Sequence, residues 1–132
     1  MPPLLWIAIV AVAIALLAMR IFPSRGGPAS DPDAQTLSQL QKAGSDLTKP
    51  HRPEFFLYLP SEAAAQEVAR AVRAMGFSAD VRHAATGTDW LCTATKEMIL
   101  TRDTIAKLHA EFSALLEPFH GQYDGWGAEV VN

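Results

Sequence analysis

The side chains of this sequence that are able to do chemistry are few, and their spacing matches no familiar reactive site. The chain has four histidines: His51, His83, His109 and His120. None stands at metal-ligand spacing from another histidine or from the single cysteine. No serine sits in the strand-to-helix motif of a hydrolase nucleophile. Asp124 near Trp126 resembles a base in a pocket, but no second titratable group lies near it in sequence. We therefore expect no catalytic residues, no metal, no cofactor and no enzyme activity.

The single cysteine, Cys92, stands between apolar neighbours. One cysteine cannot form an internal disulfide, so nothing in the sequence requires an oxidising compartment. An apolar setting favours a buried, inert thiol over a reactive one.

Charge is distributed unevenly along the chain. From residue 26 onward there are 9 Lys or Arg and 14 Asp or Glu, a net charge of −5. An acidic domain repels phosphate backbones, so we expect no direct nucleic-acid binding. The same charge suits a basic protein partner, although it also serves ordinary solubility.

The N-terminal segment is apolar throughout. Leu4 to Met19 contains no polar side chain, and the segment extends through Arg20 to Phe22. A helix of that length spans about 28 Å, close to the hydrocarbon thickness of a bilayer. The alternative is a cleaved signal peptide, but a cationic start and a cleavage motif are both missing. We expect residues 1–22 to be a transmembrane signal anchor, with the bilayer contacted through residues 4–22.

Two arginines lie on the C-terminal side of this segment, Arg20 near its end and Arg25 after it, and no cation other than the terminal amine precedes it. The positive-inside rule therefore predicts a single-pass protein of the inner membrane with its C-terminal domain in the cytoplasm. Residues 23–30, PSRGGPAS, have linker composition, so the folded domain is expected to span residues 31–132.

Capping residues and apolar spacing predict the elements of this domain. Asp31, Pro32 and Asp33 predict the start of a helix, and Gly44 its end. Five consecutive apolar or aromatic residues after Glu54 predict a central strand covered on both faces. The expected order after the first helix is a strand at 54–59, a helix from Ser61 to Met75, strands at 77–82 and 90–95, a helix from Thr101 to Gly121 and a strand at 123–131.

This order predicts an α+β fold of the ferredoxin-like (βαββαβ) class. The class has a four-stranded antiparallel sheet with two helices on one face. The extra N-terminal helix at 31–43 or a partner could cover the open face.

The last strand contains glycines at positions 125 and 127. Glycine inside a strand predicts a bulge or a close backbone approach. Such a bulge would position Tyr123 and Trp126 either as core side chains or as binding side chains, and Asp124 could accept backbone hydrogen bonds.

RNA-recognition domains share this order of elements and stack bases on aromatic residues of their central strands. Phe56 and Tyr58 could serve this purpose. The third strand, DWLCTATK, does not contain the run of basic residue, glycine and aromatic residue that the motif requires. An RNA- or small-ligand-binding module is therefore the alternative to a protein-interaction domain.

Several short motifs together resemble those of the family of the ribonuclease E inhibitor RraB, the regulator of ribonuclease activity B. They are GSDLTKP at 44–50, EFFLY at 54–58, Trp90, and QYDGWG at 122–127. The resemblance covers about residues 33 to 131. It implies a ferredoxin-like, non-catalytic domain that binds a bacterial endoribonuclease and lowers its activity.

The partner implied by this resemblance is ribonuclease E or its degradosome, bound by a membrane-tethered inhibitor. The partner-binding residues that it implies are Asp46, Lys49, Trp90, Tyr123, Asp124, Gly125, Trp126 and Gly127.

Overall fold

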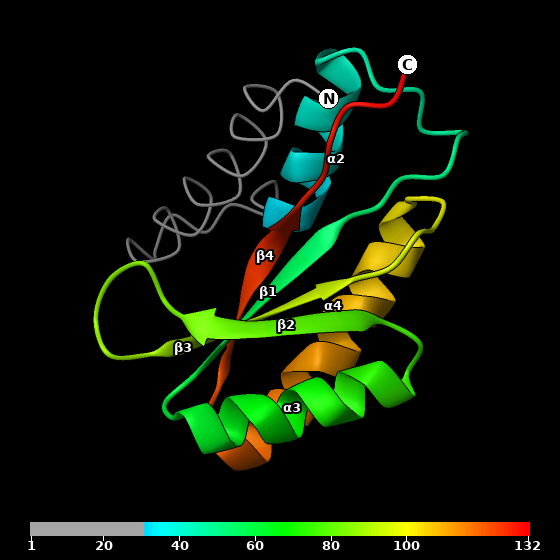
Figure 1. Ribbon diagram of the computed structural model, residues 1–132. Helices are drawn as coiled ribbons and strands as arrows, with labels where there is room; N and C mark the ends of the chain where they lie inside the picture. The colour runs from blue at the N-terminus through cyan, green and yellow to red at the C-terminus, as the bar shows by residue number, and fades with distance from the viewer. Residues whose placement is uncertain (1–30) are drawn as a thin grey trace.

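The computed structural model describes residues 31–132, which form one antiparallel sheet and three α-helices (Figure 1). The sheet has the strand order β2-β3-β1-β4. The elements are α2 (Pro32–Lys42), β1 (Glu54–Leu59), α3 (Glu62–Ala74), β2 (Ser78–His83), β3 (Trp90–Thr95), α4 (Arg102–Leu116), a short 3-10 helix η1 (Glu117–Phe119) and β4 (Gln122–Gly127). The expected α+β class and four-stranded antiparallel sheet are confirmed.

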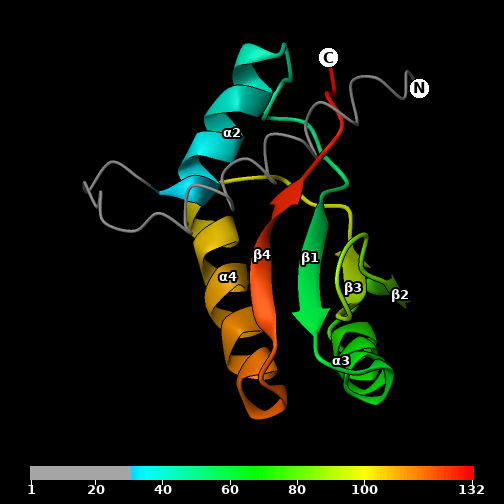
Figure 2. The same cartoon turned by 90° about the vertical axis from the view of Figure 1, so that its left-hand side faces the viewer.

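Alternation along β1 divides the sheet into two faces. Phe55, Leu57 and Leu59 are almost fully buried, and α3 and α4 pack on their side (Figure 2). The other face, which carries Glu54, Phe56 and Tyr58, is only half-buried. The strand is central, as predicted, but the prediction of a cover on both faces is wrong for the part of the chain that the structure describes. A run of apolar residues does not distinguish a two-sided core from a half-covered aromatic face.

Each α-helix begins at the predicted side-chain cap. The carboxylate of Asp31 accepts hydrogen bonds from two backbone amides of α2. Ser61 and Thr101 cap α3 and α4 in the same way. Met75, expected as the last residue of α3, is 36% exposed, because the helix has already ended at Ala74.

The first helix, α2, does not cover the open face of the sheet. It packs against α4 and β4, and its Leu37 and Leu40 enter the same core as the other helices. The Nδ1 atom of His109 lies 2.8 Å from a carboxylate oxygen of Asp33 and so ties α2 to α4. We expected either this helix or a partner to cover the open face, and the position of α2 excludes the helix.

Two element ends differ from the prediction. The helix α4 ends at Leu116 rather than near Gly121, because Pro118 lacks an amide hydrogen and cannot continue an α-helix. The strand β4 ends at Gly127 rather than at residue 131. Beyond it, Val131 bonds with the loop that follows α2 instead of with β1.

Within residues 31–132, no helix is both long enough and apolar enough to cross a bilayer. The anchor expected at 1–22 and the linker expected at 23–30 lie outside the described residues.

Candidate functional site

The predicted bulge is present in β4. Phe55 pairs with Trp126 and Leu57 pairs with Tyr123, so Asp124 and Gly125 together lie opposite the single residue Phe56. Gly125 has a backbone φ of +98°, which L-residues with a side chain rarely adopt. The extra residue changes which side chains of β4 face the core.

Because of this bulge, the two aromatic residues of β4 face the helices. Trp126 is fully buried and Tyr123 is 4% exposed. Trp126 packs near Phe55, and Tyr123 lies between Phe112 and His109, with ring centroids 6.0 and 4.5 Å away. Their large side chains fill the core, so the part of β4 that a partner can reach is formed by Gln122, Asp124 and Gly125, while Gly127 is buried beside Glu54.

Asp46 and Lys49 do not lie beside the β4 residues. The amide of Asp46 donates to the carbonyl of Val131 at 2.6 Å, and the Lys49 ammonium donates to the carbonyl of Asn132 at 2.7 Å. Hydrogen bonds from the hydroxyl and amide of Thr48 lower the pKa of the Asp46 carboxyl. These two predicted site residues hold the last residues of the chain against the loop that follows α2.

A buried hydrogen-bond network lies beneath that loop. The Ser45 hydroxyl oxygen lies 2.5 Å from His51 Nε2 and accepts a 2.8 Å hydrogen bond from the Val131 amide. His51 Nδ1 lies 2.8 Å from the Lys49 carbonyl. Since a carbonyl only accepts, Nδ1 carries the proton, and in the neutral ring Nε2 accepts from Ser45. His51 therefore links the loop that follows α2 to its own backbone and to Ser45.

Trp90 lies apart from the other predicted site residues. It begins β3, and its ring stacks on His83 of the neighbouring strand with centroids 3.8 Å apart. The ring is half-buried against the core on the helix-covered side. The structure thus distributes the predicted residues over three places rather than one.

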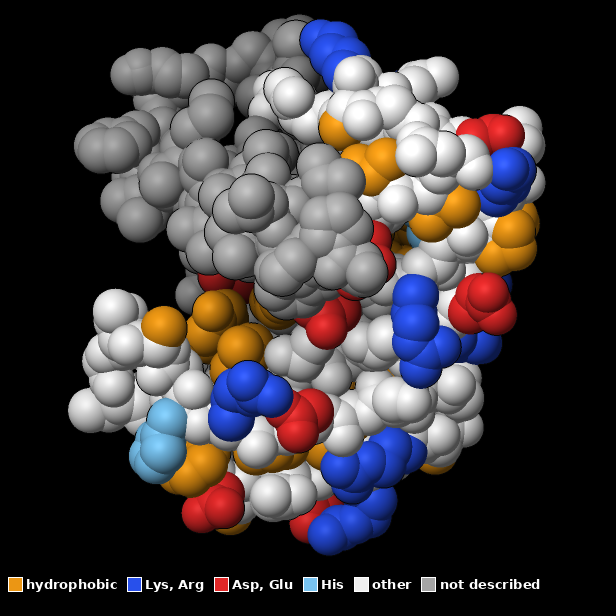
Figure 3. Space-filling model, turned by 45° about the horizontal axis from the view of Figure 1, so that its top comes forward, with side chains coloured by type: hydrophobic (Ala, Val, Ile, Leu, Met, Phe, Trp, Pro, Cys, Tyr) orange, Lys and Arg blue, Asp and Glu red, His pale blue; other side chains and the backbone are white. Residues whose placement is uncertain are grey.

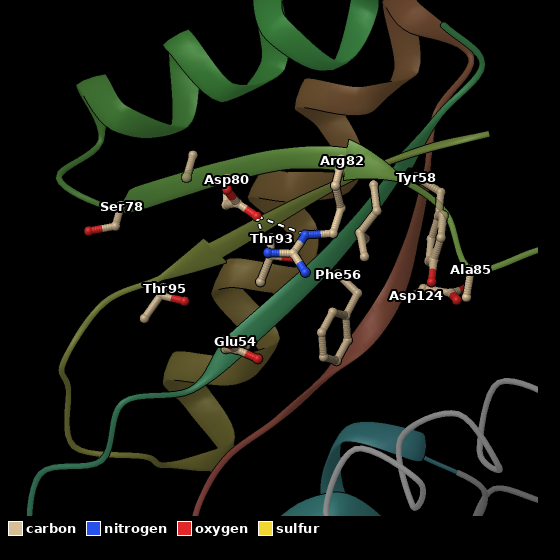
Figure 4. A pocket seen from close by; sticks show the side chains of 12 residues that line it. Glu54, Phe56, Tyr58, Ser78, Asp80, Arg82, Ala85, Thr93, Thr95 and Asp124 are labelled. Carbon is tan, nitrogen blue, oxygen red and sulfur yellow. Dashed lines mark hydrogen bonds and ion pairs between the residues drawn. The ribbon is translucent and has the colours of Figure 1, made fainter. Parts of the chain in front are cut away.

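The open face of the sheet contains a hollow that the sequence reasoning did not assemble (Figure 4). Its volume is about 420 Å³. Its main functional side chains are Glu54, Phe56, Tyr58, Asp80, Arg82 and Asp124. They come from β1, β2 and β4, and Figure 4 shows them on the same face of the sheet. Of these, Asp124 was a predicted partner-binding residue, and Phe56 and Tyr58 were the candidates for base stacking.

The register of the ladders explains this gathering. Glu54 and Phe56 of β1 pair with Thr95 and Thr93 of β3, which in turn pair with Ser78 and Asp80 of β2. Alternating residues therefore form rows across one face. The pattern was visible in each strand, but the rows required the strand order and register, which sequence alone does not give.

Charge within the hollow is predominantly negative. Three carboxylates face one guanidinium, and both Nε and Nη2 of Arg82 contact one oxygen of Asp80, at 2.9 and 2.6 Å. Burial raises the pKa of Glu54, while Arg82 opposes this shift and Glu129 adds to it. Burial, followed by the negative charge of Asp124, raises the pKa of the Tyr58 hydroxyl. The hollow is suited to receive positive charge.

Neither a metal ion nor a basic patch accounts for this surface. Among residues 31–132 there is no group of three His, Cys, Asp or Glu side chains that could hold a metal ion. Figure 3 shows one face of the molecule, where Lys and Arg side chains are spread out with Asp and Glu side chains among them. The part drawn in colour therefore presents mixed charge, without the continuous basic stripe of a nucleic-acid interface.

Comparison with known families identifies one match. The family model of RraB, the regulator of ribonuclease activity B, matches residues 30–128. No curated protein matches the chain. The matched residues include every element from α2 to β4 and all six side chains of the open-face hollow named above.

Proposed function

Because the chain belongs to the RraB family of regulators of ribonuclease activity, we propose that it binds a ribonuclease E-type endoribonuclease and inhibits it. The domain acts by contact with this protein or its degradosome, and the mechanism requires no catalytic residue, metal or cofactor of its own. The supporting observation is the acidic hollow on the open face of the sheet.

Electrostatics favours a protein partner over RNA at this surface. Glu54, Asp80 and Asp124 oppose a phosphate backbone, and the single Arg82 is already engaged by Asp80. A basic region of the ribonuclease would instead form ion pairs with the same carboxylates. That basic region would otherwise bind RNA or assemble the degradosome. When the domain occupies it, ribonuclease activity falls without any reaction catalysed by the domain.

The proposal includes tethering. The apolar residues 4–22 form a single-pass anchor of the inner membrane, and Arg20 and Arg25 keep the domain in the cytoplasm. A linker at 23–30 then holds the domain close to the bilayer surface. An alkaline phosphatase fused after Asn132 should be inactive, because the enzyme requires export; an active fusion would overturn this orientation.

We also assign the domain to the ferredoxin-like class. The support is the chain order β1-α3-β2-β3-α4-β4 together with the sheet order β2-β3-β1-β4. Fold alone does not determine function, so the regulatory role depends on family membership and on the chemistry of the open face.

Cross-linking in cells, followed by purification through a tag after Asn132, tests the proposal. The cross-linked, membrane-bound chain should recover a ribonuclease E-type enzyme. The matched control is a chain carrying the tag and residues 1–30 but lacking the domain. Recovery of membrane proteins without any ribonuclease or degradosome component contradicts the proposed function.

One observation favours a second function, a binding module for single-stranded RNA or a small ligand. Phe56 and Tyr58 lie half-buried on the open face, where bases stack in RNA-binding sheets. Titration with a fluorescent oligouridine at low salt discriminates the two. Saturable binding that is lost in the Phe56→Ser variant supports the second function.

A further inference from the structure

The hollow on the open face matches one extended segment in length. Each of the four strands has six residues and spans about 20 Å. An extended segment of six residues has the same length. The hollow of about 420 Å³ along these strands is therefore suited to a short segment of chain.

The charges of the face define the chemistry of that segment. Glu54 and Asp124 lie on two strands on either side of the Phe56 ring, and Arg82, whose guanidinium contacts Asp80, is one cation among three carboxylates of the described lining. An approaching cation would relieve the cost of keeping Glu54 charged in its half-buried position, a cost visible in its raised pKa. A second copy of this acidic face would instead place like charges opposite one another.

The aromatic residues add an apolar requirement. Phe56 and Tyr58 are half-buried and form much of the floor of the hollow (Figure 4). The long hydrocarbon stems of Lys and Arg pack on such rings, and their charged ends are attracted to the ring faces. A purely polar cation, or a phosphate-bearing ligand, would leave part of this surface unsatisfied.

We propose that the open face of the sheet binds a short, extended, basic and apolar segment of the protein partner. One Lys or Arg side chain lies between Glu54 and Asp124, with its stem on Phe56. This inference depends on the proposed function, since it names the surface and the chemistry through which the regulator holds its ribonuclease.

Fluorescence anisotropy with the full-length chain in detergent micelles tests the proposal. The probe is a fluorescein-labelled hexapeptide of alternating Arg and Leu, and the matched probe replaces each Arg by Glu. The basic peptide should bind, and the acidic peptide should not. Equal binding of the two peptides overturns the proposal, as does tighter binding of an oligouridine.

Paired variants locate the binding site. The double variant Glu54→Gln with Asp124→Asn should weaken the basic peptide about tenfold. The control, Glu111→Gln with Glu117→Gln, changes net charge equally on exposed positions along and just after α4 and should change affinity less than about twofold. Equal effects of the two double variants would show that only net charge matters and would overturn the site.

A third variant should increase the affinity for the basic peptide, which is an effect that misfolding cannot produce. Among the described residues that line the hollow, Arg82 is the one cation, so Arg82→Gln leaves Asp80 without its ion pair and should tighten peptide binding about threefold. An exposed ion pair contributes little to folding, so the variant should remain folded. Weaker or unchanged binding contradicts the proposal.

Purification of the cross-linked ribonuclease separates this inference from the function on which it depends. If the wild-type chain recovers the ribonuclease and the Glu54→Gln, Asp124→Asn chain recovers it equally well, the function stands and the site is wrong. If the wild-type chain recovers none, the proposed function fails first.

Discussion

Trp126 lies opposite Phe55 on the helix-covered face of the sheet, with ring centroids 6.5 Å apart. Simple alternation from Tyr123 would place Trp126 on the open face. The bulge at Asp124 and Gly125 inserts one residue and returns the indole to the core. Asp124 directly follows Tyr123 and so faces the open side, which means that the bulge completes the core without removing this charge from the candidate site.

The first prediction concerns the glycine of this bulge. Gly125→Ala should lower the free energy of unfolding by about 1–2 kcal/mol, because alanine is strained at positive φ. The added Cβ would meet no described atom within 4 Å, so the cost is conformational rather than steric. Urea denaturation measures it. Gly125→Asn should cost less than Gly125→Val, because asparagine tolerates positive φ; the reverse order would contradict a conformational origin of the cost.

The second prediction concerns the buried network that holds the C-terminal residues. Ser45→Ala removes the acceptor of the Val131 amide and the donor to His51, and should cost about 1–3 kcal/mol. Hydrogen exchange at the Val131 amide should accelerate more than exchange in β1. Ser113→Ala, at an exposed position of α4, is the control and should change neither measurement.

The third prediction is a pH dependence that originates at Glu54. Its raised pKa means that the folded chain binds this proton more tightly than the unfolded chain does. Its charged form therefore opposes folding increasingly as pH rises above the ordinary carboxyl value of 4.5. Glu54→Gln should gain stability relative to wild type between about pH 4 and about pH 7 in urea titrations. The exposed control Glu117→Gln should show no such gain.

The fourth prediction concerns the thiol. Cys92 is fully buried, and burial raises its pKa to about 11. A thiol-specific disulfide reagent should therefore fail to modify the folded chain near neutral pH and should modify it stoichiometrically in urea. Rapid modification without denaturant would show that β3 opens locally or that the thiol is more reactive than its burial implies.

Sequence alone predicted most elements of the domain because their signals are local. The caps at Asp31, Ser61 and Thr101 and the glycine at the bulge act on their own neighbours, and each was found where expected. The premature end of α4 also had a local signal, Pro118, which the apolar stripe running through it obscured.

The candidate site was harder to predict because it is built by pairing between strands. Asp80 and Arg82 belong to the candidate site only because β3 pairs with both β2 and β1 in a register that places them on the same face as Glu54. The sequence left Trp126 open between a core role and a binding role, since one inserted residue changes its face. Asp46 and Lys49 were grouped with β4 by resemblance, whereas they contact residues 131 and 132.

An RNA-cleavage assay with a purified ribonuclease E-type enzyme and the full-length chain in detergent micelles tests the central claim most directly. The wild-type chain should slow cleavage in a saturable, salt-sensitive manner, and the chain with Glu54→Gln and Asp124→Asn should slow it far less than the chain with Glu111→Gln and Glu117→Gln. Cleavage that proceeds at the same rate with and without the wild-type chain would contradict the account.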